Sequence, residues 1–267
     1  SSDLPTGWKI DQGMSFATGT TATTQAYGTT ETGAVTGTSG GGAVNWANGI
    51  TASSTDRSVG FLTSGSYTSP RNLFLQLVNN TGSSITSLSI GFDIEKYRSG
   101  SRAHEVRFFA SVDGTTWTEF TEGFHSYPAD AANTTISNPP LGVTKAVQMA
   151  GLSIADGANY FLRWSFTGID GNSNGQGLGL DNLIIKTSIL NYYSKSTGNL
   201  NDLSTWGTNT DGTGTEPVNF TDEHLIFNVR NNATPTIGTA WTVSGKYSKV
   251  IVGNGTDATT FTIPSTF

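Results

Sequence analysis

Hydrophobic and polar residues alternate along much of the first two thirds of this chain. The clearest stretch is 88–95, where Leu, Ile, Phe and Ile at even positions alternate with Ser, Gly, Asp and Glu at odd positions. A period of two is typical of a β-strand with one face in a core and the other exposed to solvent. The same reasoning predicts strands over 58–62, 72–78, 105–112, 146–149, 159–166 and 180–186.

Turn signals separate the predicted strands. Asp113-Gly114 follows the strand over 105–112 and predicts a hairpin that returns toward Trp117. Asn138-Pro139-Pro140 predicts a loop, because proline cannot donate a hydrogen bond to a sheet and restricts the residue before it. Helical periodicity is almost absent. We therefore expect an all-β chain whose first part is an antiparallel sandwich.

The pattern changes near Ser188. Beyond it, short apolar segments such as 225–227, 241–243 and 250–252 recur between Gly, Asn and Asp residues. This predicts a sandwich over 1–188, followed over 189–267 by a β-solenoid-like or small β region. Because so few apolar residues form only a thin core, we expect the second region to begin a longer one or to pack on a partner.

Composition favours an extracellular bacterial protein over a cytosolic enzyme. Charged residues make up 13% of the chain, against about 25% in typical soluble domains, while glycine contributes 33 residues and threonine is abundant. The absence of cysteine excludes disulfides, thiolate metal sites and a cysteine nucleophile. We expect an extracellular or cell-surface location.

Charge and hydropathy limit the partners. A net charge of -6 argues against nucleic acid, since binding it requires clustered Lys and Arg. No apolar run approaches the roughly 20 residues that cross a bilayer, so no transmembrane segment is predicted. The expected partners are glycans or other surface and secretion proteins.

No catalytic constellation is evident. The three histidines are scattered, and neither a two-histidine zinc motif nor a nucleophile elbow is present. Asp93 and Glu95 lie two apart on one strand, whereas the two carboxylates of a glycosidase usually come from different strands. Pairing with Arg107 and Arg163, or simple solvation, explains these carboxylates, and we predict a non-catalytic chain.

A carbohydrate site is the main binding hypothesis. Exposed aromatic rings are the usual platforms for sugars, and the candidates are Tyr97, Trp117, Trp46 and Trp8. Trp164 shares its face with apolar neighbours and is expected in the core. The polar faces of the predicted strands supply the candidate ligand-binding set: Asp93, Glu95, Tyr97, Arg107 and Arg163.

A calcium site is a second hypothesis. Asp170, Asn172 and Asn174 alternate in a glycine-rich loop, and Asp181 is a candidate fourth ligand. Alternating oxygen ligands with glycine at the bend are typical of calcium loops, although the glutamate that closes an EF-hand is missing. A plain Asn/Gly turn is the alternative.

Four segments in order, 54–66, 79–98, 151–164 and 177–183, resemble a family of jelly-roll-like accessory domains of large secreted or surface-anchored bacterial proteins. The resemblance covers about residues 1–188 and implies a jelly-roll-like sandwich with no agreed ligand. Two positions depart from the family pattern. Tyr97 stands where Trp is usual, and Asn182 stands where a second Asp is usual, which weakens the case for metal at that turn.

Residues 190–267 resemble the region of type IX-exported bacterial proteins that leads into a β-helix, which implies a secretion route and an architecture rather than an activity. Three functions stay open. The chain is an adhesive or structural module of a larger secreted or cell-surface protein, a carbohydrate-binding module, or the N-terminal part of a β-helix enzyme that degrades polysaccharides. The first accounts most directly for the missing catalytic chemistry.

Overall fold

The computed structural model describes residues 4–11, 15–18, 42–47, 55–62, 70–130, 136–169, 175–187, 190–231 and 234–253. The chain divides into two compact units, one made of residues 1–86 and 90–185, the other of residues 87–89 and 186–267. Across the described ranges, no helix is long and apolar enough to cross a membrane. The predicted fold class is confirmed: the chain is all-β, with an antiparallel, jelly-roll-like sandwich followed by a small β region.

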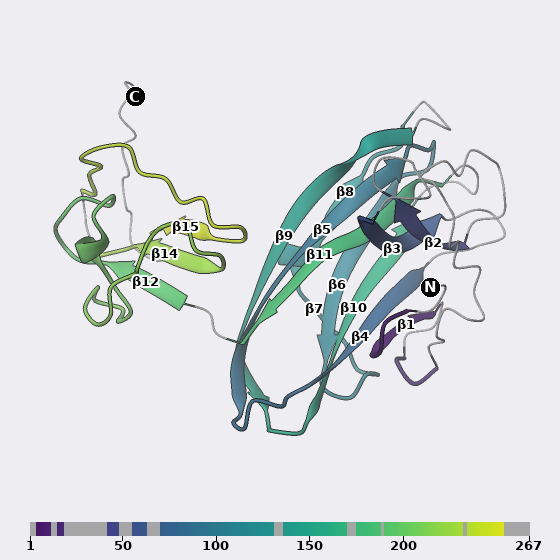
Figure 1. The fold of residues 1–267 in the computed structure, drawn as a ribbon, viewed down its shortest axis with the longest axis horizontal. Helices are drawn as coiled ribbons and strands as arrows, with labels where there is room; N and C mark the ends of the chain where they lie inside the picture. Colours follow the sequence, from purple (N-terminus) through teal and green to yellow (C-terminus); the bar gives the residue numbers. More distant parts are fainter. Residues whose placement is uncertain are drawn as a thin grey trace. The chain divides into compact units, whose positions relative to one another are not determined.

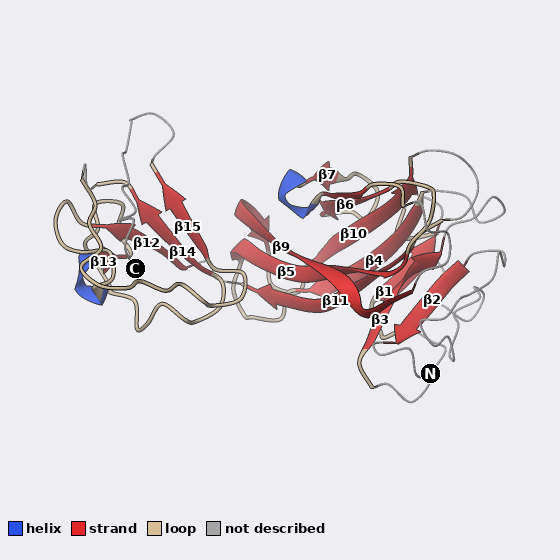
Figure 2. Cartoon of the chain, turned by 90° about the horizontal axis from the view of Figure 1, so that it is seen from above, coloured by secondary structure: helices blue, strands red, loops and turns tan. Residues whose placement is uncertain are grey.

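The sandwich consists of two layers, here called sheet A and sheet B (Figures 1 and 2). Sheet A has the order β1-β4-β10-β6-β7, with β8 also paired to β6. Its strands are β1 (Trp8–Asp11), β4 (Arg71–Val78), β6 (His104–Ser111), β7 (Thr118–Glu119), β8 (His125–Tyr127) and β10 (Asn159–Gly168). Sheet B has the order β2-β3-β11-β5-β9. Its strands are β2 (Gly42–Ala47), β3 (Arg57–Leu62), β5 (Ile85–Arg98), β9 (Ile136–Ile154) and β11 (Gly177–Lys186).

The alternation in the sequence produces the core between these layers. On β5 the apolar residues predicted to face inward are buried, and the ring centroid of Phe92 lies 5.5 Å from that of Phe108 and 5.6 Å from that of Trp164. Phe61 on β3 similarly meets Phe166 on β10 at 5.2 Å. Since these pairs join sheet B to sheet A, the even positions of β5 define its inner face and the odd positions its outer face.

The predicted loop at Asn138-Pro139-Pro140 is wrong, because these residues belong to β9. In the strand order of sheet B, β9 is a terminal strand. Proline is tolerated there because one side of an edge strand needs no ladder hydrogen bond. By contrast, the hairpin predicted at Asp113-Gly114 is confirmed: β6 and β7 pair antiparallel on either side of it.

One side chain holds two turns together at the end of the sandwich. The Asn79 amide donates to the backbone oxygens of Ser83 at 2.8 Å and Ile154 at 2.7 Å, and its oxygen accepts from the Thr81 amide at 3.1 Å. The Asp156 carboxylate accepts from the backbone amide of Gly82 at 2.8 Å. These turns occur in two of the segments that carry the family resemblance, so part of that signature has a structural role.

The second unit has a different arrangement. Its sheet has the order β13-β12-β14-β15, and both β12–β14 and β14–β15 pair in parallel. The bounds are β12 (Leu190–Ser194), β13 (Trp206–Gly207), β14 (Leu225–Val229) and β15 (Lys249–Val252) (Figure 1). Its core stacks aromatic rings on one another: Tyr192 on Phe227 at 5.5 Å and Trp206 on Trp241 at 5.7 Å.

Candidate ligand pocket in the sandwich

The five predicted ligand-binding residues occupy two different surfaces. Asp93, Glu95 and Tyr97 lie at odd positions of β5, on the outer face of sheet B. Arg107 and Arg163 lie on β6 and β10, next to core residues, and so point to the outer face of sheet A. The sandwich separates the two groups, and the structure does not assemble one site from all five residues.

Both arginines already interact with neighbouring side chains on sheet A. Arg107 donates to the carboxylates of Glu105 at 2.9 Å and Glu119 at 2.9 Å. Arg163 is buried, and its guanidinium carbon lies 4.0 Å from the ring centroid of Phe109 and 4.7 Å from that of Trp117. These are cation–π contacts within a packed layer, where burial lowers the pKa of Arg163 to about 10.

Tyr97 is also enclosed. Its ring stacks on Trp46 with centroids 5.3 Å apart, both side chains are buried, and its hydroxyl donates to the Glu95 carboxylate. A platform for sugar must expose its ring face, so Tyr97 and Trp46 do not form one. Trp117 is half-buried against Phe74, with ring centroids 5.7 Å apart.

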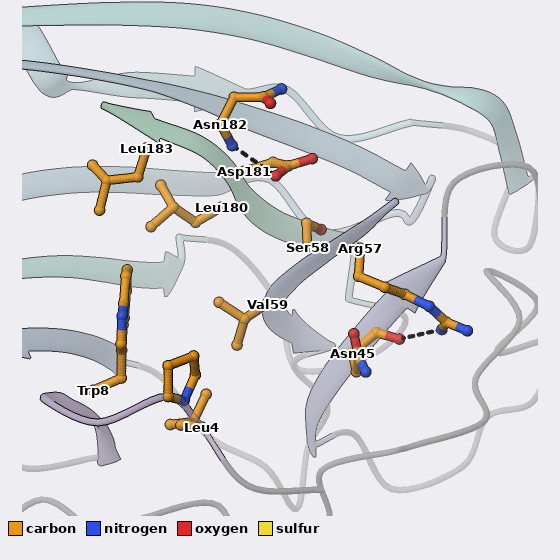
Figure 3. Close-up of a pocket in the computed structure, with 11 residues that line it drawn as sticks. Leu4, Trp8, Asn45, Arg57, Ser58, Val59, Leu180, Asp181, Asn182 and Leu183 are labelled. Atoms are coloured by element: carbon orange, nitrogen blue, oxygen red, sulfur yellow. Dashed lines mark hydrogen bonds between the residues drawn. The ribbon is translucent and has the colours of Figure 1, made fainter. Parts of the chain in front are cut away.

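Trp8, the fourth aromatic candidate, lines a pocket of about 240 Å³ in the first unit (Figure 3). Leu4, Pro5 and Trp8 come from the β1 segment of sheet A, and the other lining residues come from strands β2, β3 and β11 of sheet B. Figure 3 shows apolar side chains gathered on one side and polar side chains on the other. The polar lining residues are Asn45, Arg57, Ser58, Asp181 and Asn182.

The turn-like conformation of Asn182 shapes the rim of this pocket. Its φ of 50° lies in the left-handed region, which asparagine tolerates better than most residues. Its backbone amide donates to the Asp181 carboxylate at 2.6 Å, and its side-chain amide donates to the Asp93 carboxylate at 2.9 Å. An aspartate here would place a third carboxylate beside two others, whereas the Asn182 amide donates to one of them.

Carboxylates give this rim a negative field. Burial raises the pKa of the Glu95 carboxyl, and the nearby charges of Asp181, Asp56 and Asp93 raise it further, although the Tyr97 hydrogen bond acts in the opposite direction. Asp181 therefore belongs both to the pocket lining and to an acidic group that continues onto the outer face of sheet B.

The calcium hypothesis involves residues that lie mostly outside the described ranges. Asp170, Asn172 and Asn174 lie outside them, whereas Asp181 lies on β11 at the pocket. Within the ranges that are described, no group of three or more His, Cys, Asp or Glu side chains is arranged to hold a metal ion.

Sequence reasoning missed Asn45, Arg57 and Asn182 as pocket residues. A signal for two of them was present, because Arg57 and Asn182 lie within segments that resemble the accessory-domain family. Nothing in the local pattern marks Asn45, since its position follows from the pairing of β2 with β3, where it lies opposite Val59.

No protein-family model matches the sequence, and no curated protein matches it. Among solved structures, the K1 cleaved adhesin domain of Lys-gingipain from Porphyromonas gingivalis has a TM-score of 0.39 and 14% identity, covering 69% of this chain and 92% of that one. The K3 cleaved adhesin domain of the same protein has a TM-score of 0.35 and 12% identity, covering 69% and 93%. The N-terminal cellulose-binding domain of Cellulomonas fimi β-1,4-glucanase C has a TM-score of 0.31 and 12% identity, covering 70% and 93%. Likeness at this level does not assign a ligand, so the function must be argued from this chain's own residues.

Proposed function

We propose that the sandwich is a non-catalytic, extracellular carbohydrate-binding module that holds a sugar in the pocket between β1 and strands β2, β3 and β11. The observation that carries this proposal is the lining of the pocket, where an indole and apolar side chains lie on one side and polar residues, among them Asn45 and Arg57, lie on the other. A sugar ring presents an apolar C–H face and a rim of hydroxyl groups, which match these two sides. At about 240 Å³, the pocket is smaller than the roughly 300–1,000 Å³ of sites for drug-sized ligands, and suits a small ligand.

Each side of the pocket has a defined task in this proposal. Trp8 is half-buried and held by stacking on Trp164 at 5.8 Å, so its indole is fixed in orientation before a ligand arrives. Rigid aromatic anchors reduce the entropy lost on binding. On the polar side, the Asn45 side chain both donates and accepts hydrogen bonds and the Arg57 guanidinium donates them, which suits the hydroxyl groups of a sugar.

Binding to a glycan array, followed by calorimetry on each hit, tests the proposal. We expect saturable binding that weakens at least tenfold in Trp8→Ala and in Asn45→Ala, while Trp117→Ala, which alters an aromatic packed on Phe74 and Arg163 at the outer face of sheet A, leaves it unchanged. Thermal melting of each variant separates lost binding from lost folding. Absence of binding to any glycan, or binding that survives both pocket substitutions, would contradict the proposal and favour the adhesive or structural alternative.

We infer further that the chain belongs to a larger secreted or cell-surface bacterial protein that uses a type IX-like route. The low charge, the absence of cysteine and the resemblance of residues 190–267 support this inference. Fusing residues 190–267 to a reporter in a bacterium with that secretion route tests it, and a reporter retained in the cell would contradict it.

We also propose that residues 189–267 begin a β-solenoid, which is the architecture of the third functional alternative. Its support is repetition: Tyr192 and Phe227 lie opposite each other on the parallel strands β12 and β14 and stack, and Trp206 stacks on Trp241. Asn228 also donates to Asn191 at 3.3 Å. Stacked coils that place similar side chains above one another are typical of solenoids.

Engineered disulfides test this parallel register, because the chain has no cysteine of its own. Tyr193 lies opposite Asn228 in the pairing of β12 with β14. The pair Tyr193→Cys and Asn228→Cys should crosslink under mild oxidation, whereas Tyr193→Cys with Val229→Cys should not, because adjacent residues point to opposite faces. Equal crosslinking of both pairs would contradict the register.

A further inference from the structure

The position of the pocket selects one part of a glycan: we infer that it takes the terminal residue of a chain, or a single-residue branch, and not an internal stretch of a polysaccharide. This inference rests on the proposed function and adds the class of ligand. Three observations support it, namely the place of the pocket between the layers, the core that closes its inner side, and its volume.

The pocket lies between the two layers, at an edge of the sandwich. β1 and β2 are the terminal strands in the strand orders of sheet A and sheet B, and both contribute to the lining. Asn45 and Leu180 each lie opposite Val59, so these three residues form a row across β2, β3 and β11. Because alternate residues of a strand share a face, this row points to the same side of sheet B as Phe61, which contacts Phe166 of sheet A.

Trp8 lies across the pocket from Val59 and closes its inner side (Figure 3). Its ring stacks on that of Trp164, with centroids 5.8 Å apart. Trp164 is buried and contacts Phe92 at 5.6 Å and Phe108 at 5.2 Å, so the aromatic core begins directly behind the indole. Protein cores are close-packed and leave no passage for a chain. A ligand therefore enters and leaves at the edge of the sandwich.

The turn before β1 closes a further side of the pocket, and the remaining space is small. The Trp8 amide donates to the backbone oxygen of Pro5 at 3.1 Å, and Leu4 is buried in the lining. The volume of about 240 Å³ equals that of about eight waters at about 30 Å³ each. This space accepts one sugar ring, whereas an internal residue would also need room for a linked ring on both of its sides.

The polar side of the pocket favours a terminal residue by its chemistry. A terminal residue carries a free hydroxyl group where an internal residue carries its second glycosidic bond. The half-buried Asn45 lies in the lining and offers both a donor and an acceptor to such a hydroxyl. Replacing the hydroxyl with a glycosidic oxygen removes its donor, and the next ring would have to occupy the space of the pocket wall.

Probes of increasing length test the inference: the methyl glycoside, the trisaccharide, the hexasaccharide and the polymer of whichever sugar the glycan array identifies. Calorimetry should give association constants for the first three that agree within threefold, because one residue makes the contacts. The polymer should bind in proportion to its chain ends. Limited endo-hydrolysis at constant mass should therefore raise the amount of protein bound in proportion to the new ends.

Filling the pocket separates insertion from binding across its mouth. Val59→Phe adds volume to the inner row and should weaken binding at least tenfold, while Val112→Phe, the same change at an exposed residue outside the lining, should leave it unchanged. Leu183→Phe repeats the test from β11, so that one variant remains if the other fails in thermal melting.

The outcomes distinguish this inference from the proposed function. An association constant that rises at least tenfold from the methyl glycoside to the hexasaccharide, or polymer binding that endo-hydrolysis does not change, would overturn the inference. Binding that survives the folded filling variants would overturn it as well. If Trp8→Ala still abolishes binding in these cases, the carbohydrate pocket stands. If no probe and no arrayed glycan binds, both the proposed function and the inference are refuted.

Discussion

Replacing Asn79 with alanine should destabilise the sandwich more than its position at a surface turn suggests. The Asn79 amide uses both of its donors and its acceptor oxygen, joining the turn at 79–84 to the turn that follows β9. Only 4% of the residue is exposed. Removal of the side chain therefore takes away the side-chain links between the two turns and leaves partners that water does not fully reach, while the backbone bonds of residue 79 to Gly157 and Ala158 remain.

The magnitude follows from which partners lose their hydrogen bonds. Ile154 is buried, so its unpaired carbonyl costs about 1–3 kcal/mol. Ser83 still accepts from the Thr81 hydroxyl at 3.0 Å, and the exposed Thr81 amide is accessible to water, so these two losses together add about 1 kcal/mol. We expect Asn79→Ala to lower the free energy of unfolding of the first unit by about 2–4 kcal/mol.

Urea unfolding of the full chain, followed by amide exchange in peptides from β5 and β10, measures this change in the first unit without contributions from the second. Asn80→Ala is the matched control, because Asn80 is exposed and adjacent. A loss below about 0.5 kcal/mol in Asn79→Ala, or an equal loss in the control, would refute the reasoning that this amide joins the two turns.

Three further substitutions or conditions have defined outcomes. Gly179→Ala should cost about 1–3 kcal/mol in thermal unfolding, because the added Cβ would lie 2.1 Å from Ser58 Oγ, while Gly142→Ala, whose Cβ meets nothing within 4 Å, should be neutral. Burial lowers the pKa of His104 to about 4 from 6.5, so only the unfolded state gains a proton between these values. Stability from this group, about 3 kcal/mol, is therefore complete above pH 6.5 and lost as the pH falls toward 4, and His104→Gln should flatten the pH dependence of unfolding in that window. Trp241→Ala should cost about 2–4 kcal/mol in the second unit only, measured by amide exchange in β14, and equal loss in the sandwich would contradict the two-unit division.

Most strands of the sandwich were predictable because their signal is local. Alternation over 88–95 identifies an inner face, and the structure buries the same residues that the pattern places inside. The exception at Pro139 and Pro140 arises because tolerance of proline depends on whether a strand lies at the edge of its sheet. Strand order is set by pairings between distant segments, and local patterning does not contain it.

The candidate site was harder to predict for a related reason. Alternation shows that Asp93 and Arg163 both leave the core, but not that they leave it through different sheets. Which sheet each side chain leaves through depends on the pairing of β5 and β10 with their neighbouring strands. The pocket has the same dependence, since Trp8 and Leu180 line it together only because β1 and β11 belong to facing layers.

The glycines of β11 explain why, of two aromatic candidates, Trp46 is buried in sheet B while Trp8 lines the pocket. A Cβ at Gly177 would lie 2.6 Å from the Trp46 ring and one at Gly179 would lie 3.1 Å from it, so this indole lies against the bare backbone of the strand. Its Nε1 donates to the Leu178 oxygen at 3.1 Å, and stacking on Tyr97 covers it. Glycine within a strand often marks such a close approach of another group. Trp46 therefore packs within sheet B and is not available to a ligand. Trp8, half-buried at the edge of sheet A, is the tryptophan that lines the pocket.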